Sequence, residues 1–220
     1  MKKIVFQLLI LLVVSLNNNI YSQDSLEFSK PPPIPIENLI GHNRQYFQMI
    51  VNRIFQEKKQ VGLLNMSSYA ADYNNDIANN EFLTTTAIYH KIHKGISVNS
   101  GSTFNSKDGL KSFFGLQYMY TNKNVLIIYL PNYILDAHIV SNLALLEYKP
   151  KLNSKWSAYT RLQANYNYDF LNNNHHRSII YSRLGLTYNR ISFGIGANLD
   201  WYGSNKTFKE NYGIFLKLNL

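Results

Sequence analysis

Residues 191–201 read ISFGIGANLDW, and every second side chain in this stretch is apolar. The odd-numbered positions, from Ile191 to Trp201, carry only isoleucine, phenylalanine, alanine, leucine and tryptophan. The even-numbered positions carry only serine, glycine, asparagine and aspartate. Because side chains of a β-strand point alternately to its two faces, this stretch predicts a strand with one apolar face and one small or polar face.

The same alternation recurs in residues 156–170 and 211–220. In a soluble β-sandwich, strands are typically about 5–6 residues long and their solvent side is charged or threonine-rich. The strands predicted here are longer, about 11–15 residues, and their polar face is mostly Gly, Ser and Asn with isolated charges. Length and composition therefore favour a membrane β-barrel, in which the apolar face meets lipid and the polar face lines the lumen.

The composition agrees with a lipid-facing protein. Charged residues make up 16% of the chain and aromatic residues 14%, including 17 tyrosines. There is no cysteine, which excludes disulfides, thiolate metal sites and a cysteine nucleophile. The formal charge of +9 is spread without a basic block, which argues against nucleic acid and favours contact with acidic lipid headgroups and lipopolysaccharide phosphates.

Residues 1–22 have the pattern of a cleaved signal peptide. Lys2 and Lys3 precede an apolar run from Ile4 to Leu16, and Ser22 is a small residue suited to cleavage. A membrane anchor is the alternative, but a run of about 13 residues is short of the roughly 20 needed to span a bilayer. We therefore expect export, with the mature chain located in the outer membrane.

The segment before the barrel is predicted to hold two further parts. Residues 23–41 contain Pro31, Pro32, Pro33 and Pro35, which predicts an extended linker. Residues 42–58 place apolar side chains at a spacing of three and four, which predicts an amphipathic helix. The apolar positions of this helix are Phe47, Ile50, Val51, Ile54 and Phe55.

Turn-like clusters divide residues 60–220 into ten strands, so the predicted fold is an all-β, antiparallel up-and-down transmembrane barrel of ten strands. A range of 8–12 strands fits the pattern. The nine turns are residues 74–80, 93–95, 105–109, 121–124, 131–136, 149–154, 171–176, 189–190 and 203–209.

The chain ends in YGIFLKLNL, residues 212–220, which alternates up to its last residue. In this it resembles small outer-membrane barrels of Gram-negative bacteria, whose last strand carries a signal read by the barrel-insertion machinery. Most such signals end in an aromatic residue, and Leu220 departs from that. The resemblance implies an insertion signal formed by Tyr212, Ile214, Leu216, Leu218 and Leu220.

Five charged residues are predicted to face the lumen: Arg161, Arg183, Asp169, Asp200 and Lys217. In a narrow barrel such charges pair with one another more often than they line an open pore. The favoured function is therefore a non-enzymatic structural or interaction barrel, or a narrow pore, with no cofactor and no metal. The oligomeric state stays open.

The alternative function is a lipid- or peptide-modifying enzyme with an Asp and His site at one barrel mouth. Its candidate residues are His138 together with one of three aspartates near strand ends, Asp200, Asp169 and Asp136. Catalysis would require the base to lie within hydrogen-bond distance of its proton donor or nucleophile. Four of the other histidines, His90, His93, His175 and His176, flank predicted turns and are expected to be solvated.

Overall fold

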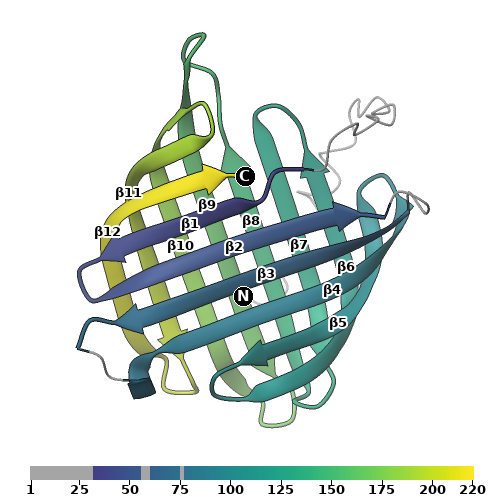
Figure 1. Cartoon of the computed structure of the whole chain (residues 1–220). Coiled ribbons are helices and arrows are strands. Elements are labelled where there is room, and N and C mark those ends of the chain that lie inside the picture. Colours follow the sequence, from purple (N-terminus) through teal and green to yellow (C-terminus); the bar gives the residue numbers. More distant parts are fainter. Residues whose placement is uncertain (1–31, 56–59, 75–76) are drawn as a thin grey trace, which may run out of the picture. The chain divides into compact units, whose positions relative to one another are not determined.

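The computed structural model describes residues 32–55, 60–74 and 77–220, and these form one closed antiparallel β-barrel of twelve strands (Figure 1). The predicted signal peptide lies outside the described residues. A short 3-10 helix, Ile77–Asn79, lies between the third and fourth strands. The strands are β1 Pro35–Gly41, β2 Arg44–Ile54, β3 Val61–Asp72, β4 Glu81–His93, β5 Ile96–Asn105, β6 Gly109–Thr121, β7 Val125–Ile134, β8 Ile139–Tyr148, β9 Trp156–Asp169, β10 Asn174–Tyr188, β11 Ile191–Tyr202 and β12 Thr207–Asn219.

Each strand pairs with the next along the chain, and β1 pairs with β12 to close the ring. Figure 1 shows β1 and β12 side by side. We call the end of the barrel that holds the start of β1 and the end of β12 the near end, and the opposite one the far end. Closure satisfies the backbone groups of both terminal strands, which in an open sheet would be unpaired edges.

Two glycines face each other where β1 meets β12. Gly41 is the register partner of Gly213. A Cβ atom on Gly213 would lie 2.0 Å from the carbonyl oxygen of Ile40 and 2.6 Å from the Cα of Gly41. Both neighbours are backbone atoms, so a larger residue would force the two strands apart.

We therefore expect the Gly213→Ala variant to lose about 1–3 kcal/mol of unfolding free energy, the range typical of overpacking. Denaturant unfolding of the protein in lipid vesicles measures this loss. An unchanged unfolding midpoint would show that the β1–β12 seam is looser than the structure indicates.

The prediction of ten strands with an N-terminal amphipathic helix was wrong. The chain has twelve strands, and residues 44–54, assigned to the helix, form β2 between β1 and β3. Residues 35–41, assigned to the linker, form β1. The barrel therefore starts at Pro35, and strands β3 to β12 occupy the region from residue 60 onward.

The error at β2 has a physical cause. Inward-facing side chains of this strand include Tyr46 and Ile50 as well as Gln48, whereas Phe47 and Val51 face outward. Because both faces of β2 carry apolar residues, apolar and polar positions do not alternate along the strand. The apolar residues happen to fall at the spacing of a helix. β-branched residues fit a pleated surface well, and β2 pairs with neighbours on both sides, so strand formation prevails over the local pattern.

The outer surface of the barrel is largely apolar. Outward side chains of the C-terminal strands are strongly exposed: Leu184 by 59%, Ile195 by 63% and Ile214 by 63%. The inward neighbours Asn198 and Asp200 are fully buried. Within the described residues no helix has the length and hydropathy needed to cross a bilayer.

A closed barrel satisfies its backbone hydrogen bonds internally, and an apolar outer belt is stable only in contact with lipid. The chain is therefore an integral β-barrel of the outer-membrane type.

Candidate functional site

The interior of the barrel is the candidate site, because the charged side chains gather there. They form three groups along the lumen, each joining strands that are not neighbours in the sheet. We call them the central triad, the far-end cluster and the near-end pair.

The central triad consists of Glu37 on β1, Arg161 on β9 and Arg183 on β10. Glu37 Oε1 accepts a hydrogen bond from Arg183 Nε at 2.8 Å, and Oε2 accepts one from Arg161 Nη1 at 3.0 Å. All three residues are at most 5% exposed. One carboxylate thus serves two buried guanidinium groups, and the second positive charge has no carboxylate of its own within the triad.

Two glutamines extend the central triad across the lumen. Gln48 on β2 and Gln163 on β9 both accept hydrogen bonds from Arg161, and Gln48 Nε2 donates to Gln163 Oε1 at 3.2 Å. Strands β2 and β9 are separated in the sheet by β1, β12, β11 and β10. The side chains therefore bridge opposite walls of the barrel at mid-height.

The far-end cluster is a closed arrangement of two acids and two arginines. Arg44 on β2 binds Glu81 Oε1 at 3.1 Å and Asp200 Oδ2 at 2.6 Å. Arg177 on β10 binds Glu81 Oε2 at 2.9 Å and Asp200 Oδ1 at 2.8 Å. The hydroxyl of Tyr202 donates to Glu81 at 2.7 Å. Because each charge has two opposite neighbours, the cluster is balanced.

The near-end pair joins β8 and β12. Lys217 Nζ donates to Glu147 Oε1 at 2.5 Å and to the hydroxyl oxygen of Tyr159 at 3.0 Å. The Tyr159 hydroxyl in turn donates to Glu147 at 2.9 Å. All three side chains are buried, with Lys217 only 2% exposed.

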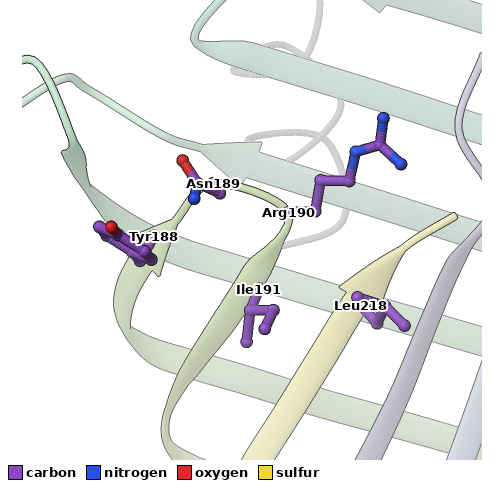
Figure 2. A pocket seen from close by; sticks show the side chains of 5 residues that line it. All are labelled: Tyr188, Asn189, Arg190, Ile191 and Leu218. Atoms are coloured by element: carbon purple, nitrogen blue, oxygen red, sulfur yellow. The ribbon is translucent and has the colours of Figure 1, made fainter.

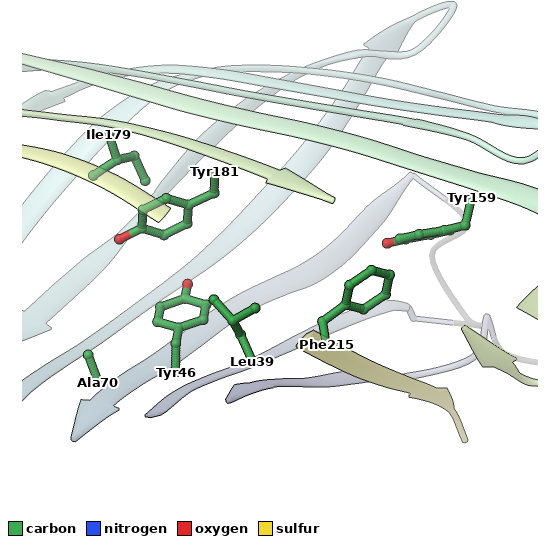
Figure 3. Close-up of a cluster of buried hydrophobic side chains, with 7 residues drawn as sticks. All are labelled: Leu39, Tyr46, Ala70, Tyr159, Ile179, Tyr181 and Phe215. Carbon is green, nitrogen blue, oxygen red and sulfur yellow. The ribbon is translucent and has the colours of Figure 1, made fainter. Parts of the chain in front are cut away.

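Apolar side chains fill the spaces between these groups. One cluster brings residues from β1, β2 and β12 against residues from β9 and β10 (Figure 3). In it, Tyr46 meets Tyr181 edge-on at a ring distance of 5.2 Å, and Tyr159 lies against Phe215 at 5.5 Å. A second cluster joins β2, β3 and β4 to β7 and β8 through Ile50, Leu64, Met66, Tyr89, Ile128, Leu130 and Leu145.

The arrangement can hold the lumen closed. Removing one partner of a buried ion pair typically costs about 3–5 kcal/mol, so such pairs resist separation. A side chain of β2 contacts the β9 wall, and the second apolar cluster extends from β2 to β7 and β8, so the interior is bridged in two directions. A wide aqueous channel would require these contacts to break.

The structure brings four of the five predicted lumen residues into this interior. Arg161, Arg183, Asp200 and Lys217 are all buried and ion-paired there. Asp169 is placed differently: it lies at the far end of β9 and accepts two hydrogen bonds from Asn172 in the following turn. Its role is to hold that turn.

The sequence-based prediction missed most of the partners of these residues. Glu37 and Arg44 were assigned to the linker and the helix, so their inward direction was hidden. Glu81 and Glu147 stand on strands and could have been found from alternation alone, whereas Arg177 directly follows a register shift. A bulge between His175 and Arg177 shifts the register of β10 and obscures the pattern there.

The predicted insertion signal lies on β12, where Tyr212, Ile214, Leu216 and Leu218 face outward and are 39–63% exposed. Leu220 follows the strand and exchanges backbone hydrogen bonds with Ile34. Recognition of this strand by the barrel-insertion machinery stays a prediction.

The Asp and His pair of the enzyme alternative is not assembled. Asp200 is fully buried between Arg44, Arg177 and Tyr181. His138 lies exposed in the turn after β7, and its Nδ1 is 2.8 Å from the Tyr133 hydroxyl. Among the described residues no group of three His, Cys, Asp or Glu side chains could hold a metal ion.

The expectation of solvated histidines is wrong for His175. This side chain is only 7% exposed, with Nδ1 2.7 Å from the Gly203 carbonyl oxygen and Nε2 2.7 Å from the Ser178 hydroxyl. Both ring nitrogens are thus engaged, Nδ1 with the β11–β12 turn and Nε2 with another residue of β10. His90 and His93 are exposed.

A pocket of about 650 Å³ lies at the near end, by the turn between β10 and β11 (Figure 2). Tyr188, Ile191 and Leu218 line it together with Asn189 and Arg190. The first three face outward, so the pocket is a depression on the outer surface and not an entrance to the lumen. It brings together no acid and base that could act as a catalytic pair.

Comparison with known proteins gives similarity at the level of fold. No protein-family profile matches the sequence, and no curated protein matches it at a significant level. Among solved structures, the chain is similar to the KdgM porin, with 10% identity over 86% of this chain and 99% of that one and a TM-score of 0.43. It is also similar to the NanC porin, with 13% identity over 86% of this chain and 100% of that one and a TM-score of 0.46.

Proposed function

We propose that the protein is a non-enzymatic outer-membrane barrel whose lumen is closed by its own side chains. It would then act as a structural or interaction protein through its outer and end surfaces. The observation that carries this proposal is the contact of Gln48 on β2 with Arg161 and Gln163 on β9, which bridges opposite walls at mid-height. Glu37 and Arg183 anchor the same bridge.

Conductance in planar lipid bilayers tests the proposal. The wild-type protein, inserted and folded, is expected to give no stepwise ion current. The double variant Gln48→Ala with Gln163→Ala removes two uncharged amides of the bridge and leaves the Glu37 ion pairs in place. We expect this variant to give small current steps. Steady, ion-selective steps from the wild type would contradict a closed lumen.

One observation favours a second candidate, a narrow pore for water and small neutral solutes. The amide oxygens of Asn99, Gln117 and Asn132 are buried and bond to no described group. They lie on the inner face of the adjacent strands β5, β6 and β7. Buried carbonyl oxygens without a protein partner commonly accept hydrogen bonds from water. A hydrated path along this wall would therefore satisfy them.

The rate of osmotic shrinkage of vesicles separates this candidate from the closed barrel. If water passes along β5–β7, vesicles holding the protein shrink faster in hyperosmotic medium than empty vesicles. The Asn99→Leu and Gln117→Leu substitutions would then slow the shrinkage. Equal rates for vesicles with and without protein would exclude the narrow pore and leave the closed barrel.

A further inference from the structure

One region of the outer surface is polar, although it belongs to the belt that faces lipid. Among the side chains that point outward from the four adjacent strands β3 to β6, six uncharged polar ones form a group. A single register line joins Asn65, Thr86, Ser102 and Ser112 across these strands. We call the six residues the hydroxyl patch: Asn65, Ser67, Thr84, Thr86, Ser102 and Ser112.

Four of the six residues of the hydroxyl patch are hydrogen-bonded to one another. Asn65 Nδ2 donates to Thr86 Oγ1 at 2.8 Å and to Thr84 Oγ1 at 3.1 Å. Ser67 Oγ lies 2.9 Å from Asn65 Oδ1 and 2.7 Å from Thr84 Oγ1. The side-chain hydroxyls of Ser102 and Ser112, in contrast, bond to nothing in residues 32–55, 60–74 and 77–220. The patch therefore holds unused donors.

Apolar side chains surround the patch. Phe82 and Phe104 pack together next to it at a ring distance of 6.0 Å, and Leu110 and Phe114 flank Ser112 on β6. The outward face of β12 shows no comparable group of polar residues in mid-strand, since Ile214 and Leu216 occupy those positions. The hydroxyl patch is thus a polar area surrounded by the apolar outer surface of the barrel.

The chemistry of the patch restricts what can cover it. Hydrocarbon cannot accept or donate a hydrogen bond, and an unpaired buried hydroxyl is costly. The six side chains carry no charge, so they form no ion pair with lipid headgroups. A partner must therefore lie within the membrane and present uncharged hydrogen-bonding groups on a flat surface. Small side chains permit such a close approach.

A second copy of the same chain meets these requirements. A serine or threonine hydroxyl both donates and accepts, so the patch is complementary to itself. A two-fold axis brings the same surface of both subunits together. Four strands spaced at about 4.8 Å, over a belt about 25 Å tall, offer about 500 Å² per copy, or about 1,000 Å² in total, which is the lower limit for a specific interface.

We propose that the protein forms a two-fold symmetric dimer in the membrane through the hydroxyl patch on β3–β6. This goes beyond the proposed function, because it depends on the chain spanning the membrane and not on a closed lumen. A non-conducting monomer or a conducting dimer would each contradict only one of the two proposals.

Cysteine cross-linking tests the dimer, because the chain has no cysteine of its own. The Ser102→Cys variant is reconstituted in lipid vesicles at high dilution and oxidised. We expect it to form a disulfide-linked dimer, since a two-fold axis through the patch brings residue 102 close to its copy. The Ile214→Cys variant, equally outward on β12, is the control and is expected to remain monomeric.

A second variant set separates interface from folding. Thr84→Val, Thr86→Val and Ser102→Ala together remove three hydroxyls while keeping similar shapes. Dimerisation, measured by energy transfer between labelled copies, is expected to weaken by about tenfold or more. Ser182→Ala, outward on β10, is the matched control. Heat-modifiable migration on gels reports whether each barrel has folded.

Two cross-linking results would overturn the proposal. One is equal cross-linking, or none, for the Ser102→Cys and Ile214→Cys variants. The other is cross-linking of the Ser102→Cys variant in native outer membranes only to a different protein, which would assign the patch to another partner. Unchanged energy transfer in the folded triple variant would also contradict it.

Discussion

The Glu37→Ala variant is expected to lose about 3–5 kcal/mol of unfolding free energy, which is the cost typical of breaking a buried ion pair from one side. Glu37 is 1% exposed and is the carboxylate that binds both Arg161 and Arg183. Its removal leaves two guanidinium groups in the barrel interior without a countercharge. Denaturant unfolding in lipid vesicles, followed by tryptophan fluorescence, measures the loss.

The matched control replaces the whole central triad by apolar residues. In the variant Glu37→Met with Arg161→Met and Arg183→Leu no charge of the triad remains, and such replacements are often neutral or stabilising. We expect it to recover most of the stability lost by Glu37→Ala. A Glu37→Ala variant that loses less than about 1 kcal/mol would show that water reaches the triad and that the lumen is open.

The Ile195→Lys variant is expected to lose about 2–4 kcal/mol, the cost of a lysine on the lipid face near the bilayer centre. Ile195 lies in the middle of β11 and is 63% exposed. In a water-soluble protein a substitution at such an exposed site usually changes stability by no more than about 0.5 kcal/mol. The variant thus distinguishes lipid from water as the medium around β11.

Leu171→Lys is the control for this second prediction. Leu171 is apolar and 69% exposed, as Ile195 is, but it lies in the turn between β9 and β10. We expect its stability to remain within about 0.5 kcal/mol of the wild type, because a turn at the barrel end meets water. Equal losses for Ile195→Lys and Leu171→Lys would contradict the assignment of the outer belt to lipid.

The C-terminal strands were predictable from sequence because their two faces differ completely. On β11 the outward positions are apolar and the inward ones are small or polar, so alternation alone gives the strand and its direction. The same signal placed Arg161, Asp200 and Lys217 in the interior. Where one face meets lipid and the other meets polar groups, a period of two is unambiguous.

The N-terminal strands were not predictable because their two faces do not differ clearly in polarity. The interior next to β2 is apolar in part, so Tyr46 and Ile50 point inward while Phe47 points outward, and no alternation remains. The prolines before β1 suggest a linker, yet Pro35 is tolerated as the first residue of a strand. Only pairing with β12 and β3 defines these two strands, and such long-range contacts leave no local pattern.

The ion pairs themselves were beyond sequence reasoning. Glu37 and Arg183 are far apart in the chain, and their contact depends on where β1 closes against β12. The sequence could predict that lumen charges pair, but not which ones. Alternation along a strand does not place every polar residue correctly. Asp169, at the end of β9, accepts a hydrogen bond from the following turn instead of facing the lumen.

Site-directed spin labelling tests most directly whether the outer belt of the barrel lies in lipid. Single cysteines, which have no background in this chain, would replace Ile195 on β11, Ile214 on β12 and Ser204 in the far-end turn, and each would carry a nitroxide. In vesicles, the labels at 195 and 214 should be accessible to oxygen, which dissolves in lipid, and protected from a water-soluble nickel chelate. The label at 204 should show the opposite. Equal access of the nickel chelate to all three positions would contradict a membrane-spanning barrel.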